Sequence, residues 1–324
     1  MHTFDDLTEK IKEGIKGINL DRQPRELYDP IYYTLDLGGK RLRPALCLLA
    51  CDIFGGNIDE ALMPAIGIEM FHNFTLLHDD IMDQAPIRRG KPTVHVKWNP
   101  NTAILSGDTM MALSYEHIMK APEWIRTEVF NVFNRTAIEV CEGQQLDMNF
   151  EKRSRVSINE YIEMIRLKTA VLLAASLKIG AKIGGAGDDD AQKLYLFGEN
   201  IGIAFQLMDD LLDVFSDTDK FGKISGGDIL TNKKTFLYLK AFELSDTETL
   251  EKLKFLFGAF KGSDEEKIKG VKEIYNQLQI KNHTGEQIEK YYRRGLMFLD
   301  EVEIDMQKKT ELMKFAEMLK NREK

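Results

Sequence analysis

The sequence predicts an all-α protein, and three observations support this fold class. Apolar residues recur at three- and four-residue spacing through long segments such as 159–183, 190–215 and 287–302. The alternation of apolar and polar residues that is typical of strands is scarce. All eight prolines lie at or before Pro122, so the rest of the chain lacks this helix breaker. We therefore expect about ten to thirteen helices in one domain over residues 1–324, with paired glycines at the turns.

Two aspartate clusters lie at the ends of apolar segments that we predict to be helical. A solvated helix end would explain one such cluster, but two clusters that follow large apolar residues favour paired metal sites. Buried carboxylates are costly unless cations neutralise them, and Mg²⁺ is held by one or two carboxylates together with substrate phosphates. We therefore expect Mg²⁺ and a phosphorylated substrate. Asp79, Asp80 and Asp83 are named the first acidic cluster, and Asp209, Asp210 and Asp213 the second acidic cluster.

The helix that leads to the first acidic cluster carries a polar stripe. We predict that it begins at about residue 63 and ends at Asp83. On a helical wheel, His72 and Asp83 lie about 20° and 40° from Asp79, whereas most other positions are apolar. Such a stripe should line a polar site. The second helix is predicted to begin near residue 188, with Gln206 one turn before its cluster.

Composition excludes several classes of function. The formal net charge of −8 argues against nucleic acid as a partner, because that surface demands a basic protein face. No segment approaches the roughly 18 uncharged apolar residues of a membrane span. The residues at the N-terminus lack the basic and apolar regions of a signal peptide. The three cysteines do not form a disulfide framework, so we expect a cytoplasmic protein with packed thiols.

Basic residues on either side of the first acidic cluster suggest anion binding. Lys40 and Arg43 share a helix face if Gly39 marks the helix start, where free N–H groups and the helix dipole favour a diphosphate. Arg88 and Arg89 follow the cluster in a loop rich in proline and glycine. Surface basic turns are the alternative interpretation of both pairs.

Further basic residues accompany the second acidic cluster. Lys168 and Thr169 interrupt an apolar helix, where the lysine either binds a ligand or extends its ammonium group to the surface. Lys223 and Lys233 follow the cluster in a glycine-rich connection, which is either a mobile lid or an ordinary loop.

Together these motifs resemble those of the trans-isoprenyl diphosphate synthases, in that family's order and spacing. The resemblance covers about residues 32–235, and the joint match is specific although each motif alone is not. The motifs are Gly38-Gly39-Lys40-Arg41-Leu42-Arg43-Pro44, His72, Leu77-His78-Asp79-Asp80-Ile81-Met82-Asp83, Arg88-Arg89-Gly90, Gly143-Gln144-Gln145-Leu146-Asp147, Lys168-Thr169-Ala170, Phe205-Gln206-Leu207-Met208-Asp209-Asp210-Leu211-Leu212-Asp213 and Gly222-Lys223.

The resemblance implies an isoprenoid synthase fold, all-helical around a deep central cavity, and a homodimer. It implies prenyl transfer from an allylic diphosphate to isopentenyl diphosphate, with about three Mg²⁺ ions per active site when substrate is bound. The catalytic residues would be Asp79, Asp83, Lys168, Asp209 and Lys223, with Asp80, Asp210 and Asp213 as further metal-binding residues. The allylic diphosphate would be held by Arg88, Lys168, Thr169, Gln206, Lys223 and Lys233, and isopentenyl diphosphate by Lys40, Arg43, His72 and Arg89.

Product length should depend on the residues one to two turns before Asp79, which are Phe71, Phe74 and Thr75. In the family, a bulky aromatic residue at Phe74's position accompanies short products, so we expect farnesyl or geranylgeranyl diphosphate. The wheel, however, puts Phe71 nearer the face of Asp79, and both phenylalanines are alternatively core residues.

Other functions remain open from the sequence. They are a medium- or long-chain polyprenyl synthase, a class I terpene cyclase, and a non-catalytic subunit of a heteromeric synthase. A cyclase would not need Lys40, Arg43 and Arg89, and a non-catalytic subunit tends to lose the acidic clusters. The segment before Lys233 departs from the family pattern, so Lys234 is an alternative diphosphate ligand.

Overall fold

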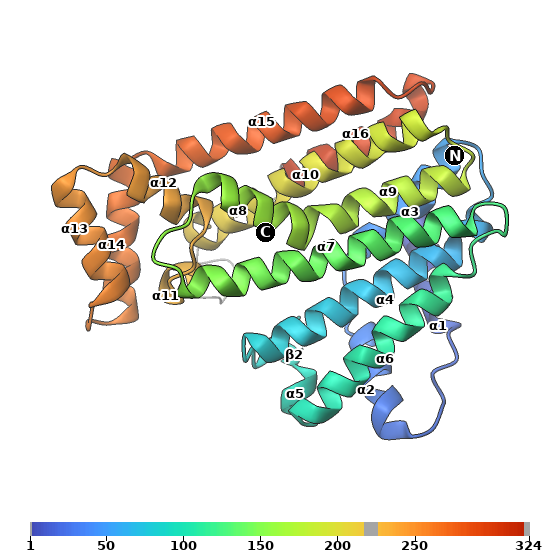
Figure 1. The fold of residues 1–324 in the computed structure, drawn as a ribbon, viewed down its shortest axis with the longest axis horizontal. Helices are drawn as coiled ribbons and strands as arrows, with labels where there is room; N and C mark the ends of the chain where they lie inside the picture. The colour runs from blue at the N-terminus through green and yellow to red at the C-terminus, as the bar shows by residue number, and fades with distance from the viewer. Residues whose placement is uncertain (1, 217–225, 321–324) are drawn as a thin grey trace. The chain divides into compact units, whose positions relative to one another are not determined.

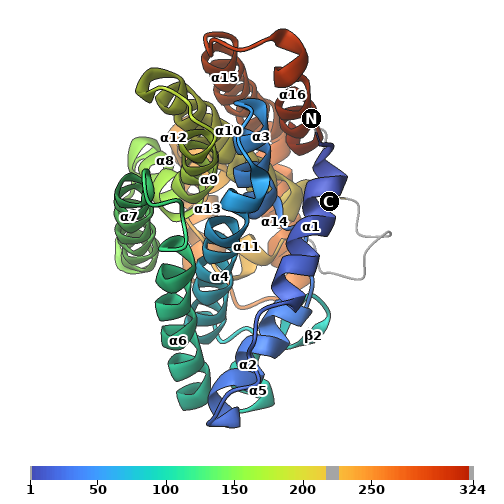
Figure 2. The same cartoon turned by 90° about the vertical axis from the view of Figure 1, so that its right-hand side faces the viewer.

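The structure is a computed structural model that describes residues 2–216 and 226–320. Within these ranges it is helical apart from one small hairpin, which confirms the all-α prediction (Figures 1 and 2). The hairpin pairs β1 (Ile87–Arg88) with β2 (Lys91–Pro92) in antiparallel register, with Arg88 opposite Lys91. Its turn residues Arg89 and Gly90 have φ values of 51° and 74°. Two successive residues with positive φ are typical of a type I′ turn.

The number of long helices agrees with the prediction once the shortest ones are set aside. In the described ranges, thirteen helices remain when the one-turn helices α5 and α11 are omitted and the continuous run α8–η1–α9 is taken as one. The helices are α1 (Phe4–Lys16), α2 (Arg25–Asp36), α3 (Leu42–Ile53), α4 (Ile58–Met82), α5 (Val94–Lys97), α6 (Pro100–Ile118), α7 (Arg126–Lys152), α8 (Ile158–Ile165), η1 (Arg166–Ala170), α9 (Val171–Ile183), α10 (Asp188–Phe215), α11 (Gly227–Leu230), α12 (Phe236–Leu244), α13 (Thr247–Gly258), α14 (Asp264–Gln277), α15 (Ile280–Asp300) and α16 (Met306–Lys320).

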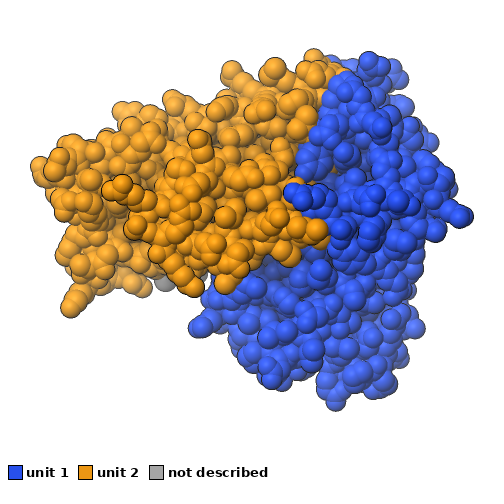
Figure 3. Space-filling view, viewed as in Figure 1, with its two compact units in different colours: residues 1–136, 175–195, 302–311 blue, residues 137–174, 196–301, 312–324 orange. Residues whose placement is uncertain are grey.

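The chain divides into two compact units, coloured separately in Figure 3. Unit 1 comprises residues 1–136, 175–195 and 302–311, and unit 2 comprises 137–174, 196–301 and 312–324. Four of the unit boundaries fall within α7, α9, α10 and α16, and the fifth, at 301/302, falls between α15 and α16. A single domain over residues 1–324 stays a prediction.

In unit 1, α4 is the central helix. It packs against α1, α3 and α6, and Figures 1 and 2 both show α4 and α6 side by side. Gly67 permits this contact, since a Cβ atom there would lie 2.8 Å from the Ser114 carbonyl oxygen. The prediction that α4 begins at about residue 63 was wrong. The helix begins at Ile58, because the Asn57 side chain caps it by accepting from the Asp59 N–H, at 3.0 Å, and Pro64 lies inside it.

In unit 2, apolar residues of α8, α10, α12 and α14 form a buried core. The predicted helix over 159–183 is present, but its middle turn, η1, is a π-helix that the sequence did not reveal. Two glycines lie against this turn. A Cβ atom on Gly143 of α7 would lie 2.7 Å from Lys168 Cα, and one on Gly202 of α10 would lie 2.7 Å from Ala170 Cα. Only glycine therefore allows α7 and α10 to approach η1 so closely. The segment predicted over 287–302 lies in α15, which ends at Asp300.

Candidate active site

The first acidic cluster, in unit 1, lies at the C-terminal end of α4. Asp79 is partly exposed, Asp80 is buried, and Asp83 is an exposed residue just past the last helical position. Arg88 of β1 binds the buried member, because its Nε donates to both Asp80 oxygens at 2.9 and 2.8 Å. Its Nη2 lies 2.7 Å from Asp80 Oδ1 and 4.0 Å from Asp79 Oδ2. The arginine predicted to hold substrate therefore also neutralises and orients this cluster.

The polar stripe predicted on α4 is occupied by His72 and an arginine partner. Arg43 Nη1 lies 3.3 Å from His72 Nε2, which makes the arginine the donor and the imidazole the acceptor. Burial lowers the pKa of His72 well below its ordinary value, and Arg43, Arg89, Arg88 and Arg41 lower it further. Four guanidinium groups therefore influence this one imidazole, which stays neutral at neutral pH.

The condition under which Lys40 and Arg43 would share a helix face, a helix start at Gly39, is not met. The helix α3 begins at Leu42, because Gly38, Gly39 and Arg41 have φ values of 77°, 127° and 47°, which no α-helix contains. Lys40 therefore lies in the preceding loop, and the loop and the first turn of α3 together present Lys40 and Arg43.

Arg89 lies against this loop from the hairpin. Its Nη1 donates to the Gly38 carbonyl oxygen, and its guanidinium carbon lies 2.8 Å from the place of a Cβ atom on Gly39. The third predicted basic residue, Arg89, is thereby brought to the loop that carries Lys40. Glycine suits position 39 because its φ of 127° is a conformation that residues with a side chain rarely adopt.

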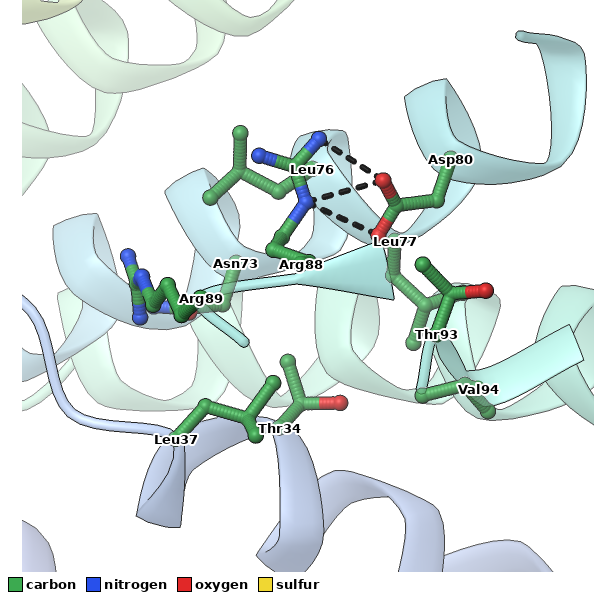
Figure 4. A pocket seen from close by; sticks show the side chains of 10 residues that line it. All are labelled: Thr34, Leu37, Asn73, Leu76, Leu77, Asp80, Arg88, Arg89, Thr93 and Val94. Atoms are coloured by element: carbon green, nitrogen blue, oxygen red, sulfur yellow. Dashed lines mark hydrogen bonds and ion pairs between the residues drawn. The ribbon is translucent and has the colours of Figure 1, made fainter. Parts of the chain in front are cut away.

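A pocket in unit 1 is lined in part by Arg88 and Arg89 (Figure 4). In the figure, the Arg88 side chain turns toward Asp80, whereas Arg89 extends away from it. Residues of α2 and α4, of the hairpin and of the segment after it contribute to the lining. The lining residues are Thr34, Leu37, Asn73, Leu76, Leu77, Asp80, Arg88, Arg89, Thr93 and Val94.

The residues predicted to set product length lie on α4, one to two turns before the first acidic cluster. Phe71 is fully buried and packs against Phe74 and Phe133, with ring centroids 5.4 Å apart in each pair. Phe74 is buried as well, and its ring lies 4.7 Å from that of His78. Thr75 is partly exposed, and its Oγ1 donates to the His72 carbonyl oxygen at 2.8 Å. Both phenylalanines thus belong to an aromatic group, and a role in product length stays a prediction.

In unit 2, the π-turn η1 carries Lys168 and Thr169. Lys168 Nζ donates to Asp147 Oδ2 at 2.7 Å, and Thr169 Oγ1 donates to Gln206 Oε1 at 3.1 Å. A π-turn widens the helix and is frequently found at functional sites. The turn thus directs two neighbouring polar side chains, one toward α7 and one toward α10.

The second acidic cluster, also in unit 2, has a buried central member. Asp210 accepts a hydrogen bond from the Tyr161 hydroxyl and another from Gln206 Nε2, the latter at 3.2 Å. Burial, together with the charge of Asp228, raises the pKa of Asp210 to about 7, while the hydrogen bond from Tyr161 opposes this rise. Asp209 and Asp213 are partly exposed. Thr169, Gln206, Asp210 and Tyr161 therefore form one continuous chain of hydrogen bonds.

The segment after the second acidic cluster returns to it in α11. The Asp228 N–H donates to Asp213 Oδ2 at 2.9 Å. Burial raises the pKa of Asp228 to about 6, and nearby Lys233 opposes this rise. Lys234, the alternative to Lys233, donates from Nζ to the Phe150 carbonyl oxygen at 2.7 Å. Lys223 lies outside the described residues.

Comparison with known proteins identifies the family. Residues 24–278 match the model of the polyprenyl synthetase family. The chain belongs to this family. A geranylgeranyl diphosphate synthase of Methanosarcina mazei is 47% identical over 68% of this chain and 69% of its own. A geranylgeranyl diphosphate synthase of Sulfolobus acidocaldarius is 38% identical over 92% of this chain and 91% of its own. A crystal structure of a geranylgeranyl pyrophosphate synthase has a TM-score of 0.94 and 43% identity, covering 99% of both chains.

The acidic clusters contain carboxylate oxygens, which are donor atoms of the kind that Mg²⁺ binds. In the described ranges, no three or more His, Cys, Asp or Glu side chains are grouped to hold a metal ion on their own. Mg²⁺ usually takes one or two carboxylates together with waters and substrate phosphates. The partly exposed Asp79 and Asp209 supply hard oxygen donors of this kind.

Sequence reasoning assigned no role to several residues that the structure connects to the site. Asp147 binds Lys168, Tyr161 binds Asp210, and Asp228 binds Asp213. Glu69 binds Arg41 in unit 1. A signal for Glu69 was available, because it is the only acidic residue between Glu60 and Asp79 in an apolar helix.

Proposed function

We propose that the protein is a short-chain trans-prenyltransferase that condenses isopentenyl diphosphate with an allylic diphosphate. Its product would be farnesyl or geranylgeranyl diphosphate. The observation that carries the proposal is the similarity, along almost the whole chain, to proteins named geranylgeranyl diphosphate synthases. The described part of the chain contains no helix with the length and apolarity needed to span a bilayer.

Unit 1 supplies a cationic group for the diphosphate of isopentenyl diphosphate. In the proposal, Lys40, Arg43 and Arg89 donate to the diphosphate oxygens, and His72 holds the Arg43 guanidinium. The neutral state of His72 supports this role, because an imidazole nitrogen that accepts from Arg43 cannot carry a proton. Arginine forks suit diphosphate oxygens because several N–H groups can bind at once.

The remaining basic and polar residues would bind the allylic diphosphate. The fixed directions of Lys168 and Thr169 on the π-turn support this role, since a held side chain loses less entropy on binding a ligand. The residues proposed for this substrate are Arg88, Lys168, Thr169, Gln206, Lys223 and Lys233.

We propose that the carboxylates of both acidic clusters bind Mg²⁺ together with this diphosphate, with Asp79, Asp83 and Asp209 as the principal ligands. When bound, Mg²⁺ supplies charge neutralisation to the departing diphosphate. Asp80, Asp210 and Asp213 would assist, and the bonds of Asp80 to Arg88 and of Asp210 to Tyr161 support an orienting role for these two.

The reaction begins when the allylic C–O bond breaks and its electron pair leaves with the diphosphate. Lys168 and Arg88 would stabilise the developing negative charge, which is usually the largest single contribution to catalysis. The double bond of isopentenyl diphosphate then attacks the allylic cation, and Arg43 and Arg89 hold that substrate in place. A proton finally leaves, and the departed diphosphate is the proposed acceptor. The product is one isoprene unit longer.

Product length would be limited by the aromatic residues before Asp79. Phe74 and Phe71 are buried in one aromatic group, so a growing chain directed along α4 would meet a wall of rings. This favours a short product over a medium- or long-chain one.

A class I terpene cyclase and a non-catalytic subunit are less consistent with the residues present. A cyclase would have no use for a second anion site made by Lys40, Arg43 and Arg89. A non-catalytic subunit would not need two intact acidic clusters.

The decisive experiment is incubation with isopentenyl diphosphate, Mg²⁺ and dimethylallyl, geranyl or farnesyl diphosphate in turn, followed by chromatography of the products. Asp79→Ala and Asp209→Ala should each abolish turnover while circular dichroism shows an intact helical protein. Asp305→Ala, which removes an exposed carboxylate outside both clusters, serves as the control. Chelation of Mg²⁺ should stop the reaction and its return should restore it. Normal turnover by either cluster variant would refute the metal assignment.

We also propose a homodimer in the cytoplasm. Cys47, Cys51 and Cys141 are free, and free thiols are usual in a reducing compartment. Measurement of the molar mass by light scattering tests the dimer.

A further inference from the structure

A buried ion pair lies beneath the loop that carries Lys40. Glu69 of α4 is 2% exposed and Arg41 is 6% exposed. Arg41 Nη1 donates to Glu69 Oε1, and its Nη2 donates to the Leu35 carbonyl oxygen. Asn73, one turn along α4, donates from Nδ2 to the same Glu69 Oε1 at 2.9 Å. The Arg41 guanidinium is thereby fixed at both of its terminal nitrogens.

The backbone at Arg41 adopts a conformation that this pair can hold in place. Arg41 has φ 47° and ψ 35°, in the left-handed region, where a residue other than glycine costs free energy. It stands between Lys40 and the first residue of α3, so its dihedral angles set the direction of the loop relative to the helix. A buried ion pair at the same residue supplies a physical reason for the chain to keep this conformation.

Other contacts show that the loop is held from more than one side. Arg89 donates to the Gly38 carbonyl oxygen from the hairpin, and Arg43 lies 3.3 Å from His72 of α4. The segment from Gly38 to Arg43, which comprises this loop and the first turn of α3, therefore contacts α4 through Arg41 and Arg43. Only one of these contacts, that of Arg41, is to a buried carboxylate.

The negative charge of Glu69 also offsets part of the positive charge of the arginines around His72. Arg41, Arg43, Arg88 and Arg89 all act on His72, so four cations lie near one another before any diphosphate binds. Asp80 neutralises Arg88, and Glu69 neutralises Arg41. A buried arginine that loses its carboxylate is strongly unfavourable, and it would move toward solvent and carry the loop with it.

We propose that Glu69 is a positioning residue for the isopentenyl diphosphate site, because through Arg41 it holds the loop that presents Lys40 and Arg43. This inference rests on the proposed function of that site. Glu69 itself touches no substrate. Its removal should therefore weaken the binding of isopentenyl diphosphate while the binding of the allylic diphosphate, assigned to other residues, changes little.

Glu69→Gln is the first variant, because it keeps the shape of the side chain and removes its charge. Steady-state kinetics should show a KM for isopentenyl diphosphate raised roughly ten- to hundredfold, with the KM for the allylic diphosphate within about threefold of wild type. Glu69→Asp, which restores the charge on a shorter side chain, should recover part of the loss. Lys182→Met is the matched control, since it removes another buried, ion-paired charge of unit 1, and it should leave both KM values unchanged.

The double variant Arg41→Met/Glu69→Leu separates positioning from stability. Replacing a buried ion pair by apolar residues of similar size commonly preserves or increases stability. Under the proposal the double variant folds, yet its KM for isopentenyl diphosphate remains raised. It also decides the matter if Glu69→Gln fails to fold.

The outcomes are distinct. A wild-type protein that neither binds isopentenyl diphosphate nor turns it over would overturn the proposed function, and this inference with it. An active wild type whose Glu69→Gln variant keeps a normal KM for isopentenyl diphosphate would overturn the inference alone. A double variant with a wild-type KM would also overturn it, because the pair would then contribute to stability only.

Discussion

Gly143 offers a sharp test of the π-turn, because it touches the turn only through backbone atoms. In Gly143→Ala, the new Cβ would lie 2.7 Å from both Leu167 C and Lys168 Cα. Lys168 N would lie closer still, and ordinary van der Waals contact begins at 3.4 Å, so helix α7 or η1 must move by more than about 0.7 Å. Backbone cannot rotate aside as a side chain can, so Lys168 and Thr169 must be displaced relative to α7 whichever of the two elements moves.

The expected magnitude follows from that displacement. Overpacking of this kind typically costs about 1–3 kcal/mol of stability. A misplacement of about 1 Å in a catalytic arrangement can cost about a hundredfold in rate. We therefore expect kcat/KM for the allylic diphosphate to fall roughly ten- to hundredfold, with the protein still folded at 25 °C.

The assay is steady-state kinetics at saturating isopentenyl diphosphate, combined with thermal unfolding. Gly285→Ala in α15 is the control, because nothing lies within 4 Å of its added Cβ atom. That variant should keep its kinetics and gain roughly 0.5–1 kcal/mol, as alanine replaces glycine in a helix. Wild-type kinetics in Gly143→Ala would refute the view that the geometry of η1 matters for catalysis.

Two further predictions concern α4. Phe74→Ala should lengthen the products seen by chromatography, at a cost of about 3–5 kcal/mol for the lost buried ring; an unchanged product spectrum would exclude Phe74 from the wall. Because burial and neighbouring arginines lower the pKa of His72, the folded protein should keep this imidazole neutral at pH 6, as NMR titration of the ring would show. The unfolded chain takes up this proton near pH 6.5, so the contribution of His72 to stability is present above that pH and is lost as the pH falls below it. A His72 that titrates at or above its ordinary pKa would contradict the described contact with Arg43.

The fold class and the acidic clusters were predictable because both depend on local pattern. Helical spacing of apolar residues is written in the sequence, and carboxylates at the end of an apolar helix are conspicuous there. The start of α3 was not, since the positive φ at Arg41 accompanies a contact with a buried partner, Glu69, which lies 28 positions along the chain. Pro64 misled the prediction for α4, because a proline near the start of a helix removes only one hydrogen bond.

The hydrogen bonds that support the site side chains could not be predicted from the sequence, because they join different helices. The bond between Lys168 and Asp147 joins two helices, and so does the bond between Tyr161 and Asp210. Such pairs depend on the packing of α7, α8 and α10, which no periodicity encodes. The π-turn was hidden as well, because the apolar residues on either side of it keep an ordinary helical spacing.

The hairpin makes the contacts of two arginines depend on the same turn. Arg88 and Arg89 are consecutive residues, yet one serves the carboxylates of α4 and the other the loop before α3. The turn next to them includes Gly90, whose φ of 74° is strained for a residue with a side chain. A single substitution at Gly90 would therefore disturb two contacts at once, that of Arg88 with Asp80 and that of Arg89 with Gly38, although glycine carries no charge and touches neither of these partners.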